Sequence, residues 1–100
     1  MTLTELKELY SSVKVTEKTT QQLLTMRDIA YKNRERLLRS ADDISKIKLR
    51  MWSGFVSYDI EEARRCLVSR LEDEANIISD YIIRLEEEIA QRLDNWTIGL

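Results

Sequence analysis

The sequence predicts an all-α protein: a short N-terminal helix, then a long antiparallel helical hairpin that completes a helical bundle by oligomerisation. The chain of 100 residues contains no proline and only two glycines, so it lacks the residues that form the tight turns between short strands. Apolar residues recur every three or four positions over two long segments, which is the spacing of amphipathic helices. A chain of this length is one small domain.

The first helix is expected over residues 2–13. Thr2 followed by Glu5 forms a capping-box pattern, and four apolar residues then share one helical face: Leu3, Leu6, Tyr10 and Val13. Because this helix is short, we expect it to cover only the open end of the hairpin, near residues 16–25 and 88–96.

The first long helix is expected over residues 16–52, with Thr16 as its cap. Its apolar stripe averages 3.5 residues per step and comprises Leu23, Met26, Ala30, Asn33, Leu37, Ala41, Ile44, Ile47 and Met51. An alternative is a kink near residue 40, since Ser40 followed by Asp43 forms a second capping pattern.

The turn of the hairpin is expected over residues 53–57, where Gly54 suits the left-handed position just past a helix. The second long helix follows over residues 58–95. Its stripe averages 3.6 residues per step, the period of a straight helix, and comprises Ile60, Ala63, Leu67, Leu71, Ala75, Ile78, Ile82, Leu85, Ile89, Leu93 and Trp96.

The apolar face of the second long helix is too wide for one partner helix. Four further apolar residues flank the main stripe: Val68, Ile77, Tyr81 and Ile83. Two helices and a short third one bury little for a domain of this size. We therefore predict a homo-oligomer, with a dimer favoured, in which coiled-coil-like packing covers this flank.

The hairpin tip carries three aromatic residues close together, Trp52, Phe55 and Tyr58. Aromatic side chains are common anchors of protein interfaces. The tip is therefore a candidate docking site for a second protein. The alternatives are a dimer contact and a local cluster that closes the loop.

Charge divides the chain more clearly than its net value of −2 indicates. Residues 16–52 hold nine basic and five acidic residues, whereas residues 57–100 hold five and eleven. Five basic residues lie at helical spacing on the first long helix: Lys32, Arg36, Arg39, Lys46 and Arg50. This basic stripe could contact nucleic-acid phosphates, but ion pairs across the hairpin, such as Arg36 with Glu74 and Arg39 with Glu72, are the favoured interpretation.

Several kinds of chemistry are excluded by composition. The chain has no histidine and one cysteine, Cys66, so Ser/His/Asp triads, histidine-containing zinc sites and disulfide frameworks are ruled out. Consecutive acids such as Glu72-Asp73-Glu74 point to different helix faces, so a magnesium-dependent nucleotide hydrolase is the least favoured class. We predict no catalytic residue, no metal and no cofactor.

No apolar run approaches the roughly 18 residues needed to span a bilayer, so no membrane association is expected. The unpaired cysteine and the absence of a charged-then-apolar leader favour the cytoplasm. The predicted function is that of a non-enzymatic helical interaction and assembly protein. The alternative is a nucleic-acid-associated accessory factor of viral, plasmid or archaeal origin that uses the basic face of residues 32–50.

Overall fold

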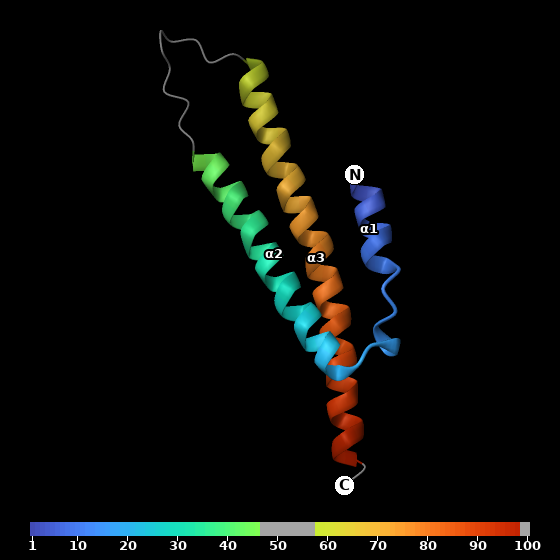
Figure 1. Cartoon of the computed structure of the whole chain (residues 1–100). Coiled ribbons are helices and arrows are strands. Elements are labelled where there is room, and N and C mark those ends of the chain that lie inside the picture. Colours follow the sequence, from blue (N-terminus) through green and yellow to red (C-terminus); the bar gives the residue numbers. More distant parts are fainter. Residues whose placement is uncertain (47–57, 99–100) are drawn as a thin grey trace.

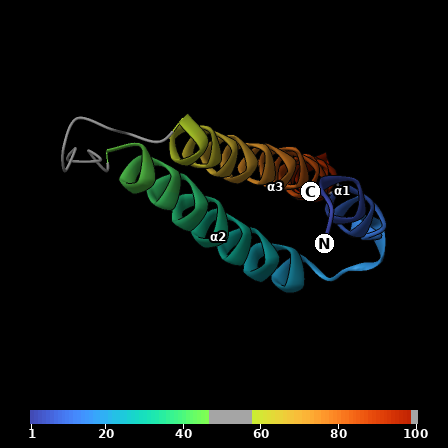
Figure 2. The ribbon, with the colours of Figure 1, turned by 90° about the horizontal axis from the view of Figure 1, so that it is seen from above.

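The computed structural model describes the backbone of residues 1–46 and 58–98, and the side-chain surroundings of residues 1–46 and 61–95. These residues form helix α1 (Leu3–Ser11), a 3-10 turn η1 (Val15–Glu17), helix α2 (Thr20–Lys46) and helix α3 (Tyr58–Ile98), and they include no strand. The two long helices run antiparallel and side by side (Figure 1), and Figure 2 shows the same hairpin from above. The predicted all-α hairpin with a short N-terminal helix is therefore confirmed.

Side-chain caps set the first residues of α1 and α2. The hydroxyl of Thr2 accepts a hydrogen bond from the backbone N–H of Glu5 at 3.1 Å, as the sequence predicts. Thr19 and Gln22 form a reciprocal capping box: the Gln22 N–H donates to Thr19 Oγ1 at 3.1 Å, and the Thr19 N–H donates to Gln22 Oε1 at 2.9 Å. Because this box satisfies the first N–H groups, α2 begins at Thr20 and not at Thr16, which lies in η1.

α2 is one uninterrupted helix through Ser40, so Ser40 does not begin a second helix. The expected turn at residues 53–57 lies outside the described residues. α3 has 41 residues, which gives a length of about 60 Å at 1.5 Å per residue.

The core lies where the middle of α3 meets α2. Its buried side chains belong to the two predicted stripes and to Tyr81: Leu23, Ala30, Ala41, Ala75, Ile78, Tyr81, Ile82, Leu85 and Ile89. The ends of the α3 stripe differ from the prediction, because Leu67 is 49% exposed and Leu93 is 59% exposed. Two long helices that cross at an angle, as in Figure 1, are covered best along their middle.

α1 lies alongside the middle of α3, and the expectation that it covers only the open end of the hairpin is wrong. Figure 1 shows α3 between α2 and α1. The rings of Tyr10 and Tyr81 pack with centroids 4.8 Å apart. Arg84 donates from Nη1 to the carbonyl of Tyr10 and from Nη2 to that of Val13, both at 2.9 Å.

Two further arginines of α3 bind the same N-terminal segment. Arg70 Nη2 donates to the carbonyl of Met1 at 2.6 Å, and Arg92 Nη2 donates to that of Val15 at 3.3 Å. Only the carbonyl of Tyr10 belongs to α1, and those of Met1, Val13 and Val15 lie just before or after the helix, so the guanidinium groups bind the backbone at both ends of α1. These contacts hold α1 parallel to α3.

Candidate functional site

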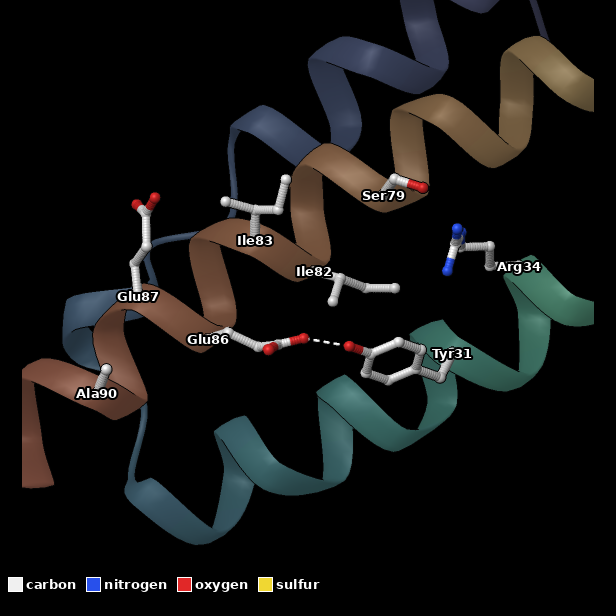
Figure 3. A pocket seen from close by; sticks show the side chains of 8 residues that line it. All are labelled: Tyr31, Arg34, Ser79, Ile82, Ile83, Glu86, Glu87 and Ala90. Atoms are coloured by element: carbon white, nitrogen blue, oxygen red, sulfur yellow. Dashed lines mark hydrogen bonds between the residues drawn. The ribbon is translucent and has the colours of Figure 1, made fainter.

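An open groove with a volume of about 510 Å³ runs between α2 and α3. We call it the α2/α3 groove, and Figure 3 shows its lining: Tyr31, Arg34, Ser79, Ile82, Ile83, Glu86, Glu87 and Ala90. A second hollow, lined by Tyr31, Arg34, Glu35, Leu38 and Arg39, continues along α2. The two hollows share Tyr31 and Arg34, so they form one concave surface.

A hydrogen bond between the two long helices crosses this groove. The phenol of Tyr31 donates to Oε1 of Glu86 (Figure 3). This bond to the carboxylate is the main cause that raises the pKa of Tyr31 above its ordinary value of 10.0, with smaller contributions from desolvation and from the charge of Glu86. The bond fixes the position of the ring, and the Tyr31 side chain remains exposed to solvent.

Arg34 contributes a cation to the same groove. Its Nε is buried and has no hydrogen-bond acceptor among the described residues. The neighbouring carboxylates are already engaged, since Glu86 accepts from Tyr31 and Glu35 accepts from Arg39 at 2.7 Å. A buried N–H group without an acceptor costs free energy. Because the chain's own atoms cover Nε, only the part of the guanidinium group that lines the groove is open to a partner.

Large apolar side chains of the groove are exposed. Tyr31 is 42% exposed, Leu38 is 40% exposed and Ile83 is 54% exposed. Tyr31 and Leu38 lie seven residues apart on α2, and therefore on one face of the helix. Figure 3 shows Ile83 and Glu87 projecting from the same side of α3. The surface thus combines apolar groups with two arginines, Arg34 and Arg39, and with three exposed carboxylates, those of Glu35, Glu86 and Glu87.

The structure separates the four apolar residues predicted to flank the α3 stripe. Tyr81 is buried in the core against Tyr10. Ile77 is half-buried beside α1, in a cleft that Lys7 and Tyr10 also line. Val68 is half-buried, and Ile83 belongs to the α2/α3 groove. α1 therefore covers part of the flank that we expected a second copy to cover.

The three predicted tip residues cannot be placed as a surface. Trp52 and Phe55 lie outside the described residues, and Tyr58 begins α3 with its side chain outside them. The docking interpretation of the tip therefore stays a prediction.

The basic stripe is exposed on α2, but the ion pairs expected across the hairpin are wrong. Arg39 pairs with Glu35 at 2.7 Å, and Lys46 pairs with Asp42 at 2.7 Å, which raises the pKa of Lys46 above 10.5, first through the hydrogen bond. Glu74, the expected partner of Arg36, instead accepts from Arg70 on its own helix at 2.9 Å. Partners one turn away on the same helix are closer than residues on the other one. Lys32 and Arg36 are exposed, and Arg50 lies outside the described residues.

Sequence reasoning missed Tyr31, Arg34 and Leu38 because the polar residues around them hide the second face of α2. A weak signal existed, since Tyr31 and Leu38 are separated by two helical turns. It also missed Arg70, Arg84 and Arg92, which bind the N-terminal segment. The face of α3 that these three arginines share was not recognised, because every charged residue of α3 was considered as an ion-pair partner for α2 and none as a partner for the N-terminal segment.

Within residues 1–46 and 58–98 no group of three or more potential metal-ligating side chains comes together. No helix among the residues described is long and apolar enough to cross a membrane. No protein-family model matches the chain, and neither a curated protein nor a solved structure matches it significantly. The surface described above is therefore the basis for a functional proposal.

Proposed function

We propose that this chain is a non-enzymatic assembly protein that pairs with a second copy through the α2/α3 groove. The observation that carries the proposal is the gathering of Tyr31, Leu38 and Ile83, each 40% exposed or more, around one groove and its continuation. Apolar groups gathered at a concave surface are typical of interfaces.

The small core supports the proposal as well. Among the described residues only Leu23 and Leu85 are large side chains with less than 2% exposure. Burying one further half-exposed isoleucine or leucine contributes about 1 kcal/mol. A second copy would add several such side chains from each protomer, which is a useful gain for a domain of this size.

A pair of matched variants tests the surface. Ile83 and Ile29 are both 54% exposed, but Ile29 lies two residues from Tyr31, on nearly the opposite side of α2. We expect Ile83→Glu to weaken self-association at least about tenfold, measured as mass by light scattering across a concentration series, and Ile29→Glu to leave it unchanged. Equal effects of the two variants would reject the groove as the interface.

Nucleic-acid binding is a second candidate, because Lys32 and Arg36 are exposed on α2 and make no ion pair with another described residue. The carboxylates of Glu35 and Asp42 beside Arg39 and Lys46 weaken the positive field along the stripe. Salt-sensitive retention of duplex or single strands, lost in the Arg36→Glu/Arg39→Glu variant, would support this function.

A further inference from the structure

We infer that the Glu87 carboxylate of a second copy pairs with the guanidinium group of Arg34 where that group lines the α2/α3 groove. The inference rests on the proposed function, because it names the contact that completes the α2/α3 groove. The second copy thereby contributes a residue to the site, since Arg34 lines the groove and its continuation and forms no ion pair with another described residue.

Within one chain some carboxylates of this surface accept a hydrogen bond from a neighbouring side chain, and one does not. Glu86 is engaged by Tyr31 and Glu35 by Arg39. Glu87 is exposed and projects beside Ile83, whereas Arg34 extends from α2 on the other side of the groove (Figure 3). The groove thus presents one cation and one available carboxylate that do not meet in the same chain.

A surface with a separated cation and carboxylate is complementary to itself. In a twofold dimer each copy contributes the same patch, so a contact between Arg34 and the other copy's Glu87 occurs twice. Charges on the two long helices favour the same arrangement. α2 carries six basic and four acidic residues and α3 carries five and eleven, so laying α2 of one copy over α3 of the other pairs opposite charges.

This complementarity selects a second copy over another occupant. A different protein or a nucleic acid would have to match the cation and the carboxylate separately, whereas the chain itself already carries both halves. Ile83 lies beside Glu87 and supplies the apolar contact that excludes water from the ion pair, which strengthens it.

Charge exchange tests the contact. Arg34→Glu alone places two carboxylates opposite each other at both contacts, and Glu87→Arg alone places two arginines there. We expect each variant to self-associate at least about tenfold more weakly than the unmodified chain. Mixed in equal amounts, the two variants are expected to form a heterodimer in which both contacts are restored, and the double variant is expected to form a homodimer.

The control replaces Arg34→Glu by Arg65→Glu, which reverses a charge whose side chain is 73% exposed and paired with Glu62 outside the groove. Because this variant keeps both Arg34 and Glu87, it is expected to self-associate as strongly as the unmodified chain. Masses are measured by sedimentation equilibrium, and circular dichroism at 222 nm verifies that each variant keeps its helices.

The possible results separate this contact from the proposed function. If the unmodified chain dimerises but Arg34→Glu dimerises equally well, the contact is overturned while assembly stands. If both single variants are weakened and their mixture associates no more strongly than either variant alone, the pairing of Arg34 with Glu87 is also overturned. If the unmodified chain is a monomer at every concentration, both the contact and the proposed function fail.

Discussion

The ring of Tyr10 on α1 packs against the ring of Tyr81 on α3, with centroids 4.8 Å apart and planes inclined by 46°. Tyr81 is 7% exposed, and burial is the main cause that raises the pKa of its phenol above 10.0. This pair joins the N-terminal helix to the middle of the hairpin. The contact explains why part of the apolar flank of α3 is buried within one chain.

The contact predicts an energetic coupling between the two tyrosines. Tyr10→Leu and Tyr81→Leu should each destabilise the chain, and the double variant should lose about 1 kcal/mol less than the sum, because a tilted aromatic pair contributes that much beyond burial. Urea unfolding at one protein concentration measures the free energy of unfolding of each variant in this double-mutant cycle. The same cycle with Tyr31 in place of Tyr81 should give no coupling, and a coupling of equal size there would contradict the packing.

Arg84 should hold α1 in place through the carbonyls of Tyr10 and Val13. Arg84→Met keeps the aliphatic stem but removes both charged donors, so the free energy of unfolding should fall by about 2 kcal/mol. Amide hydrogen exchange should accelerate in residues 3–13 and stay slow in the middle of α2. Arg65→Met provides the control, and acceleration of equal size there would show that the effect is not specific to the α1 contacts.

Tyr31 should stabilise the hairpin in a pH-dependent way. Its pKa is raised above 10.0 by the hydrogen bond to Glu86, so its contribution is complete below pH 10 and is lost as the pH rises through the raised pKa. The difference in absorbance at 295 nm between the unmodified chain and Tyr31→Phe isolates this titration. Glu86→Gln should move it back toward 10.0, and an unchanged titration would show that the bond does not form in solution.

The basic stripe should contribute little to stability. Its resolved pairs, Arg39 with Glu35 and Lys46 with Asp42, are exposed and lie one turn apart on the same helix, where such pairs contribute about 0.3–0.5 kcal/mol. Arg36→Glu/Arg39→Glu should therefore change the free energy of unfolding by less than about 1 kcal/mol. A larger loss in thermal unfolding would indicate ion pairs between the long helices.

The long helices and the middle of the core were predictable because periodicity determines which face is buried. Ala75, Ile78, Ile82, Leu85 and Ile89 form the buried part of the α3 stripe, as their spacing indicates. The position of α1 was not predictable from its own apolar face, because the spacing of that face does not specify which part of α3 it packs against. The arginines that bind its carbonyls decide the position.

The candidate site was predicted only in part. Ile83 was singled out by its spacing, whereas Tyr81 and Ile77 share that spacing but face α1. Tyr31 and Arg34 were missed because a groove depends on how two helices lie against each other. The apolar periodicity of a single helix does not give this arrangement. The opposite charges of the two halves were recognised, but the structure pairs them largely within each helix.

Sedimentation equilibrium of the unmodified chain at micromolar concentrations tests the central claim most directly. A second copy in the α2/α3 groove predicts a mass of about twice 11.8 kDa that falls toward the monomer value on dilution. A constant mass of 11.8 kDa at every concentration would contradict it.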